Sequence, residues 1–357
     1  PAGNCTASRG PSGGASKLSI STGPGRYEMK HVDVAIIGGS LAGAACVRVL
    51  TRFGIDAVAF ERDRFPREKV CGGFLSPGAI DLLDQLGTLE AVRAAGAMTV
   101  RSSRVRMGNF EACVPLPRAG LGISRSTLDS LIANHPGVQH GSVRGVQRTG
   151  NTFRVQLEEG EISARVVVDA AGKLSRFTTR KTAPEFGVQF YEGGSHGDIL
   201  DFWFFENGYG GAVSVEGDRS NSCFLIYKDA LRAYLRSGFE NSNGKKKILV
   251  TGPLSYKKRD SDFLSVGDAA GMVDPFCGEG MRHALETGMF AATVVAEGLR
   301  SGKSYDTMRA SYEQESQRLW SRKRRLGRLF RAMLKHPRLS AAGFRLNPEY
   351  WLPKLWD

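Results

Sequence analysis

Residues 32–50 read Val-Asp-Val-Ala-Ile-Ile-Gly-Gly-Ser-Leu-Ala-Gly-Ala-Ala-Cys-Val-Arg-Val-Leu, and this stretch decides the fold. The apolar run 32–37 predicts a buried parallel strand, and Gly38, Ser40 and Gly43 predict a tight turn into a helix. A turn without side-chain bulk lets a pyrophosphate approach the N–H groups and the positive dipole end of that helix. The stretch therefore predicts an α/β fold with a dinucleotide site.

The next strand supplies the second half of the dinucleotide fingerprint. We predict a helix over 42–53 and a strand over 55–60 that ends at Glu61. Glu61 lies 23 residues after Gly38, where an acidic side chain can bind an adenosine ribose hydroxyl. The usual G-x-G-x-x-G pattern would have glycine at position 40 instead of serine. The turn alone therefore also fits a sharp βα connection in an ordinary α/β fold.

Composition limits the classes of protein that the chain can belong to. Its 357 residues, 41% of them hydrophobic, are more than one minimal domain needs. The longest apolar runs are strand-sized, whereas a membrane-spanning helix needs about 20 apolar residues. The six cysteines form no CxxC pair and no cluster with metal-ligand spacing. We therefore expect reduced thiols, no metal and a cytoplasmic protein.

The formal net charge of +13 has a clear contributor near the end of the chain. Residues 318–338 contain nine Lys or Arg and no acid, with apolar residues at helical spacing, and so predict a basic amphipathic helix. Such a helix could dock its apolar stripe on the body of the protein, or it could lie peripherally on an anionic membrane or partner. We expect a monomer and no role in nucleic-acid binding. The apolar residues of this helix are Leu326, Leu329, Phe330, Met333 and Leu334.

A second glycine-rich block, residues 267–280, begins more than two hundred residues after the first turn. A strand over 263–266 would lead into it, and the glycines at 278 and 280 would open a helix that reaches about residue 299. Two blocks in this order and at this distance resemble the two FAD-binding signatures of the flavoprotein monooxygenase and geranylgeranyl reductase superfamily. The resemblance covers residues 32 to about 339 and implies an FAD cofactor.

The resemblance assigns contacts with FAD to both blocks and to the segments between them. Asp268 would accept a hydrogen bond from a ribityl hydroxyl, although it could instead cap its turn, and Pro275 and Phe276 would line the flavin ring. The dipole of the helix that follows would stabilise negative charge on the reduced ring. The implied cofactor-binding residues are Gly38, Ser40, Leu41, Ala42, Gly43, Glu61, Arg62, Lys69, Cys71, Gly72, Gly73, Arg125, Gly267, Asp268, Pro275, Gly278, Glu279, Gly280 and Met281.

Two intermediate segments extend the resemblance. Residues 121–129 resemble the family's Arg-containing segment beside the cofactor, which makes Arg125 a candidate flavin contact. Ser126 and Asp129 are predicted to form a capping box for the helix that starts there. Residues 166–176 resemble the family's DG motif, with alanine in place of the usual acid.

One segment resembles geranylgeranyl reductases in particular. Residues 67–73 read Arg-Glu-Lys-Val-Cys-Gly-Gly, and that family carries a Cys-Gly-Gly element beside the flavin. The run Pro-Phe-Cys-Gly-Glu-Gly-Met at 275–281 is also similar to the family's usual form. Cys71 is therefore a candidate catalytic thiol. The alternative is a small apolar residue in a tight turn.

Between residues 172 and 267 the pattern changes to short alternating strands, which we predict over 186–191, 198–205, 211–215 and 221–227. They resemble the antiparallel substrate sheet of the family. Its apolar and aromatic side chains could cover the flavin and line a greasy pocket, although half of such a sheet must face the core. The substrate candidates are Phe202, Phe204, Tyr209 and Phe224.

We therefore predict a three-layer FAD-binding Rossmann-type α/β domain from residues 29–180 and 256–300, with some strands shared with an inserted antiparallel substrate sheet at 181–255. Residues 301–357 would form C-terminal helices, and residues 1–28 a disordered leader or added segment. The resemblance implies reduction of carbon–carbon double bonds in a hydrophobic, isoprenoid-like substrate, with NAD(P)H or another electron donor as reductant. A monooxygenase of an aromatic or polyketide substrate and a non-catalytic flavoprotein that binds an anionic surface stay open.

Overall fold

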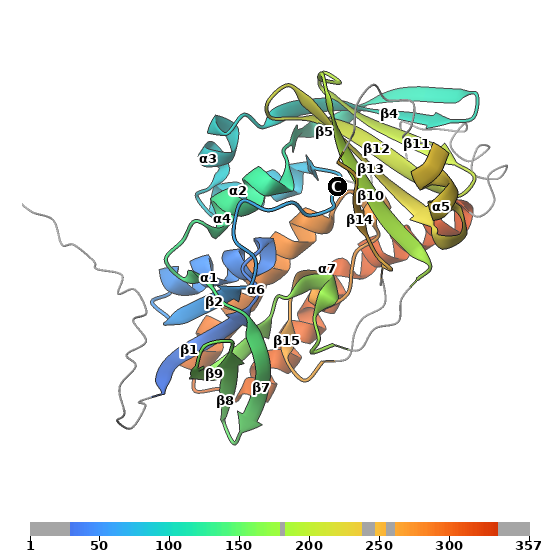
Figure 1. The fold of residues 1–357 in the computed structure, drawn as a ribbon. Helices are drawn as coiled ribbons and strands as arrows, with labels where there is room; N and C mark the ends of the chain where they lie inside the picture. Colours follow the sequence, from blue (N-terminus) through green and yellow to red (C-terminus); the bar gives the residue numbers. More distant parts are fainter. Residues whose placement is uncertain (1–28, 179–182, 238–246, 255–260, 335–357) are drawn as a thin grey trace, which may run out of the picture.

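The computed structural model describes residues 29–178, 183–237, 247–254 and 261–334. Two β-sheets form the body of the molecule (Figure 1). Most of the helices lie beside the first sheet, and the last long helix runs from the first sheet to the second. The predicted segments 1–28 and 335–357 lie outside the described residues.

The first sheet carries the dinucleotide fold. Its strands are β1 (Lys30–Ile37), β2 (Ala57–Glu61), β6 (Val138–His140), β7 (Val143–Thr149), β8 (Thr152–Leu157), β9 (Glu161–Asp169) and β15 (Leu264–Ser265). They are ordered β6-β2-β1-β9-β8-β7, and β15 also pairs with β9. Strands β6, β2, β1, β9 and β15 are parallel, so their carboxyl ends meet at one edge. Their buried Val, Ile and Ala side chains form the largest core cluster.

The second sheet is built from two separate parts of the chain. Its strands are β3 (Phe74–Leu75), β4 (Met98–Met107), β5 (Phe110–Gly122), β10 (Glu185–Gly193), β11 (Ile199–Phe205), β12 (Gly208–Val215), β13 (Arg219–Tyr227) and β14 (Leu249–Thr251). They are ordered β14-β10-β13-β12-β11-β4-β5-β3. All pairs are antiparallel except β11 with β4. Strands β3, β4 and β5 are thus the ones that the first part of the chain shares with this sheet.

The helices of the described chain are α1 (Leu41–Arg52), α2 (Pro77–Gln85), α3 (Leu89–Ala94), α4 (Arg125–Ala133), α5 (Lys228–Ser237), α6 (Gly280–Arg300) and α7 (Tyr305–Leu334). Most of them are amphipathic segments of eight or more residues. Helix α6 packs directly on α1, because Gly288 lets the two backbones approach each other at Ala42. In the part of the chain that the structure describes, no helix is long and apolar enough to cross a membrane.

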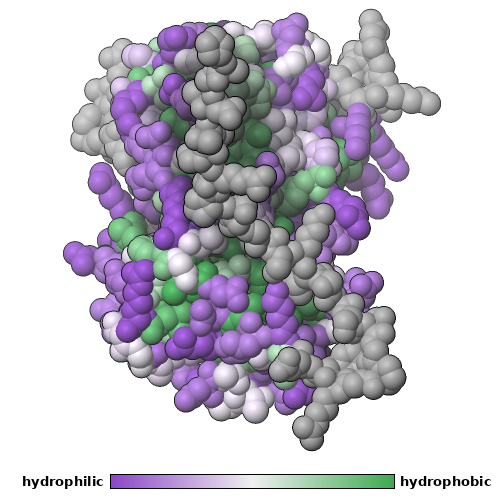
Figure 2. Space-filling model, turned by 90° about the vertical axis from the view of Figure 1, so that its left-hand side faces the viewer, coloured by the Kyte–Doolittle hydropathy of each residue, from purple (hydrophilic) through white to green (hydrophobic). Residues whose placement is uncertain are grey.

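The predicted fold class is confirmed: an α/β Rossmann-type domain, an inserted sheet and C-terminal helices. The strands predicted over 186–227 match β10 to β13 within a few residues. On the face shown in Figure 2, hydrophilic residues form most of the outer contour, and apolar residues gather toward the middle.

Candidate cofactor and substrate site

A cavity of about 690 Å³ lies where the carboxyl ends of the parallel strands face the second sheet. Its lining combines the turns after β1, β2, β9 and β15 with apolar side chains of the second sheet. The crevice outside the carboxyl ends of parallel strands is where α/β proteins bind their ligands. The predicted site residues that line it are Gly38, Ser40, Leu41, Ala42, Glu61, Arg62, Lys69, Cys71, Gly72, Gly73, Arg125, Phe202, Tyr209, Phe224, Gly267, Asp268, Pro275, Gly278, Gly280 and Met281.

Four residues that we predicted to touch a ligand lie behind the cavity wall instead. Gly43 packs under the first turn. Glu279 is fully buried and accepts a hydrogen bond from the Ser76 hydroxyl at 2.8 Å. Phe276 is buried, and the half-buried Phe204 packs on it with the ring centroids 5.6 Å apart. These side chains pack behind the residues that line the cavity.

The first glycine turn packs closely on neighbouring backbone. Gly38 has a φ of +101°, and a Cβ there would lie 2.5 Å from the carbonyl oxygen of Ala170. A Cβ at Gly43 would lie 1.8 Å from the carbonyl oxygen of Gly38. No side chain caps the start of α1, because the hydroxyl of Ser40 donates to Asp129 instead. The first N–H groups of α1 therefore remain directed at the cavity, as a pyrophosphate requires.

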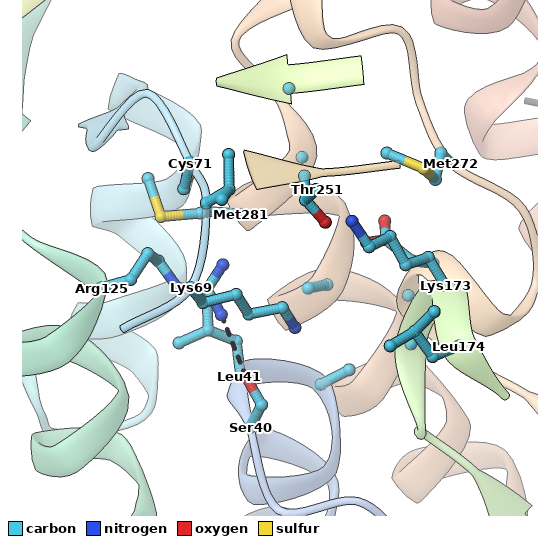
Figure 3. Close-up of a pocket in the computed structure, with 18 of the residues that line it drawn as sticks. Ser40, Leu41, Lys69, Cys71, Arg125, Lys173, Leu174, Thr251, Met272 and Met281 are labelled. Atoms are coloured by element: carbon cyan, nitrogen blue, oxygen red, sulfur yellow. Dashed lines mark hydrogen bonds between the residues drawn. The ribbon is translucent and has the colours of Figure 1, made fainter. Parts of the chain in front are cut away.

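A buried ion pair fixes this turn against α4. Arg125 donates to Asp129 from Nε at 2.8 Å and from Nη2 at 2.9 Å, and the same Nη2 donates to the Ser40 hydroxyl at 3.0 Å (Figure 3). Burial acts to raise the pKa of Asp129, but the cations Arg125, Lys69 and Arg67 together more than offset this and hold the pKa of that carboxyl below its ordinary value. Arg67 lies 3.4 Å from the carboxylate.

The predicted capping box of Ser126 and Asp129 is wrong. The N-cap of α4 is Ser124, whose hydroxyl accepts a hydrogen bond from the Thr127 N–H at 3.2 Å. Asp129 lies one turn into the helix and points to Arg125. The pattern misled because serines occupy both 124 and 126, and only the backbone conformation tells which of them precedes the first helical residue.

Glu61 is the acidic residue of the dinucleotide fingerprint, which we predicted to bind the adenosine ribose. Its Oε2 accepts from the N–H of Gly39 at 3.0 Å, and its Oε1 accepts from the N–H of Asp63 at 3.2 Å. Arg67 lies 3.5 Å from Oε2. The carboxylate thus joins the glycine turn to the end of β2 and lines the cavity there. Its contact with a ribose hydroxyl stays a prediction.

The second sheet holds the Cys-Gly-Gly loop in place. The N–H of Cys71 donates to Gln189 Oε1 at 2.9 Å, and its carbonyl accepts from Asn221 Nδ2 at 2.9 Å. Gln189 Nε2 in turn donates to Asn221 Oδ1 at 2.7 Å, and both amide side chains are buried. These three hydrogen bonds fix the loop backbone at the cavity. The catalytic role of Cys71 stays a prediction.

Two lysines extend into the same open part of the cavity (Figure 3). Lys69 comes from the loop after β2, and Lys173 comes from the single turn of 3₁₀ helix at Gly172–Leu174. Burial lowers the pKa of Lys69, and the neighbouring Arg125 lowers it further. Burial also lowers the pKa of Lys173, to about 8, although Asp268 acts in the opposite direction.

The second glycine block shapes the opposite wall. The N–H of Gly267 donates to the Thr287 hydroxyl at 2.9 Å, which fixes the turn that carries Asp268 against α6. Asp274 then accepts from the N–H of Phe276 at 3.1 Å and starts a short 3₁₀ turn before α6. Among the described residues, no three His, Cys, Asp or Glu side chains are grouped so as to hold a metal ion.

Residues that the sequence did not assign to the site complete it. Lys173, Gln189 and Asn221 line or brace the cavity, and Asp129 anchors its buried arginine. The signal for Lys173 was its place directly after the glycine of the DG motif. The two amides gave no signal, because their partner Cys71 lies more than one hundred residues away in the sequence.

Comparison with known proteins agrees with this geometry. Residues 31–180 match the model of the FAD binding domain, which spans the first glycine turn, Glu61 and the DG-like segment. That part of the chain is therefore similar to FAD-binding domains. The cavity fits FAD, since the first glycine turn lines it and no side chain caps the N–H groups at the start of α1.

Proteins similar to this chain include reductases. A menaquinone reductase of Mycolicibacterium smegmatis is 26% identical over 75% of this chain and 77% of its own length. A digeranylgeranylglycerophospholipid reductase of Thermoplasma acidophilum is 24% identical over 83% of this chain and 85% of its own length. The solved structure of PqsL from Pseudomonas aeruginosa, described as a probable FAD-dependent monooxygenase, superposes with a TM-score of 0.72 at 19% identity. It covers 88% of this chain and 100% of its own and shows a shared fold.

Proposed function

We propose that this flavoprotein reduces a carbon–carbon double bond in a hydrophobic, isoprenoid-like substrate. The observation that carries the proposal is the single cavity that joins a dinucleotide-binding turn to an apolar wall. That wall includes Leu200, Phe202, Phe224, Leu225 and Met272. The two relatives named as reductases support the reaction class, because the name of the second includes a lipid with geranylgeranyl groups.

In this proposal, different parts of the chain bind FAD and orient the substrate. The turn at 38–43 and the start of α1 would bind the pyrophosphate of FAD, and Asp268 would accept from its ribityl chain. The second sheet would orient the apolar substrate and keep water away from it. Bound FAD would supply hydride transfer, which no side chain can perform. We further propose NAD(P)H or another electron donor as the external reductant.

An anaerobic single-turnover experiment tests the proposal. The purified protein is loaded with FAD, reduced without oxygen and mixed with geranylgeraniol, while the flavin absorbance and the product mass are followed. The proposal predicts reoxidation of the flavin and a product about two mass units heavier, from one added H₂. A requirement for oxygen with addition of one oxygen atom would instead identify a monooxygenase. Flavin that no substrate reoxidises would favour a non-catalytic flavoprotein.

We also propose that α7 brings the protein to an anionic membrane surface. Four arginines and two leucines are exposed among the described side chains of this helix. The leucines are Leu319, with 49% of its surface exposed, and Leu329, with 55%. The arginines are Arg318, Arg322, Arg325 and Arg328. Arginines beside exposed leucines fit an anionic headgroup region. The predicted apolar contact of Leu326 with the protein body is present, because that residue packs on the core of the second sheet. Residues 335–338 of the predicted helix lie outside the described chain.

Vesicle flotation tests this surface. The double variant Arg318→Gln/Arg325→Gln should lose most binding to vesicles with phosphatidylserine, and the loss should match the effect of raised salt. The matched control is Arg93→Gln/Arg101→Gln, which removes two exposed arginines elsewhere. Equal binding by both double variants would contradict the proposal.

A further inference from the structure

Lys173 occupies the boundary between the two halves of the cavity. It follows Gly172 at the carboxyl end of β9, on the dinucleotide side. Its side chain extends toward the part of the cavity where Thr251 and Met272 lie, on the side of the second sheet (Figure 3). A ligand that fills both halves must therefore pass the ammonium group of Lys173.

Three groups among the described residues shift the pKa of Lys173. Asp268, on the turn after β15, stabilises the charged form, whereas Lys69, from the loop after β2, destabilises it. Cys223, on β13, would stabilise it only as a thiolate, and burial raises the pKa of that thiol so that it is neutral. Burial of Lys173 itself has the largest effect and favours the neutral amine. The lysine therefore gives up its proton more readily than a lysine in water does.

We infer that Lys173 is the group that exchanges a proton with the substrate in this cavity. The inference rests on the proposed function and names a residue for a step that the dinucleotide turn and the apolar wall cannot perform. Reduction of a double bond adds a hydride to one carbon and a proton to the other. Lys173 Nζ would lose that proton, become a neutral amine and regain a proton from water, so that charge and atoms balance.

Competitive labelling measures the ionisation of Lys173 without any turnover. Trace acetic anhydride reacts with the neutral amine only, so the extent of modification at each pH, read by mass spectrometry, gives the titration of each lysine. Lys173 should half-titrate near pH 8 in the protein without substrate. Half-titration near 10.4, the ordinary lysine value, would overturn the inference.

Two neighbouring substitutions should move this titration in opposite directions. Lys69→Met removes a nearby positive charge, so Lys173 should titrate at higher pH. Asp268→Asn removes a nearby negative charge, so Lys173 should titrate at lower pH. Neither variant needs to turn over for this readout. The same titration in both variants would contradict the placement of Lys173 between these two groups.

The pH dependence of single turnover tests the proton transfer itself. With geranylgeraniol and reduced protein, the wild-type rate should fall above about pH 8, as the proton is lost. Lys173→Met should lower the rate by about 10²–10⁴-fold and remove this alkaline limb. Lys173→Arg should keep its charge and show no limb near pH 8. A Lys173→Met protein with the wild-type rate and pH profile would overturn the inference, whereas wild-type protein that reduces no isoprenoid would contradict the proposed function instead.

Discussion

At the scale of single residues, glycines allow close backbone packing beside the cofactor half of the cavity. Gly43 and Gly193 make this clear, because both lack a side chain but differ in their surroundings. A Cβ at Gly43 would lie 1.8 Å from a backbone oxygen, whereas a Cβ at Gly193, at the end of β10, would meet no atom within 4 Å. A rigid backbone contact cannot move aside as a flexible side chain can.

Gly43→Ala should therefore displace α1 from the turn. We expect a loss of about 1–3 kcal/mol in the free energy of unfolding and an FAD affinity at least about tenfold lower. Urea unfolding and a flavin fluorescence titration measure the two effects. Gly193→Ala, at the end of β10 and outside the cavity lining, is the matched control and should change neither. Equal behaviour of the two variants would contradict the close packing at Gly43.

The buried carboxylate of Asp129 gives a second prediction for a single residue. Asp129→Asn leaves Arg125 buried with a neutral partner and should cost about 3–5 kcal/mol at pH 7. Because its pKa is lower in the folded protein, the wild-type carboxylate stabilises the fold above the unfolded value of about 3.9. This contribution should be lost as the pH falls through the lower folded pKa. In acid the wild-type protein and Asp129→Asn should therefore have similar free energies of unfolding. Asp84→Asn, at an exposed position on α2, should show no such difference.

At the scale of elements, strands of the second sheet control a loop of the first domain. The side chains of Gln189 on β10 and Asn221 on β13 hold the backbone of Cys71. Asn221→Ala should release the loop at 67–73, which speeds amide hydrogen exchange there and lowers single-turnover rates. The melting temperature should also fall, because the buried Gln189 Nε2 loses its acceptor. Ser222→Ala, on the other face of β13, is the control and should leave the loop protected. Unchanged exchange in Asn221→Ala would show that another contact holds the loop.

The contact between α6 and α7 buries a histidine. His283 is fully buried and packs edge-on against Trp320 with 4.6 Å between ring centroids, and neither ring nitrogen has a hydrogen-bond partner among the described residues. Burial lowers the pKa of His283 to about 3, and Arg324 adds to this effect. The unfolded chain binds a proton near pH 6.5, so folding stability should fall as the pH drops from 6.5 to about 3, by about 1.4 kcal/mol per pH unit.

His283→Leu should flatten this part of the pH profile of stability. Chemical denaturation at intervals between pH 4 and 7 measures the slope for both proteins. His140→Leu is the control, because His140 is exposed on β6. A slope that persists in His283→Leu would assign the pH dependence to other groups.

Local sequence patterns predicted the elements and most cavity-lining positions. They could not predict pairs of side chains that lie far apart in the sequence. The turn at Gly38 and the acid at Glu61 follow spacing rules, so both could be read directly. The capping box at Ser126 failed because Ser124 caps the helix, and Asp129 is engaged by Arg125 and by Ser40, which lies 89 residues away. The depth of Phe204 could not be read, because alternation gives two faces of a strand but does not say where the cavity ends.

At the scale of the whole molecule, function depends on how the two sheets meet. In the proposed function, the dinucleotide turn alone would bind no substrate, and the apolar face alone would carry out no redox chemistry. The chain joins them by placing β3, β4 and β5, which precede α4, in the same sheet as β10 to β14. One cavity then contacts both domains. The central claim is therefore that FAD binds in this cavity.

The most direct test is a titration of the protein, first stripped of flavin, with FAD. We predict saturable binding of one FAD per chain with quenched flavin fluorescence, and weaker binding in Gly43→Ala but not in Gly193→Ala. Absence of saturable binding by the wild-type protein, at FAD concentrations well above the protein concentration, would contradict the assignment of the cavity.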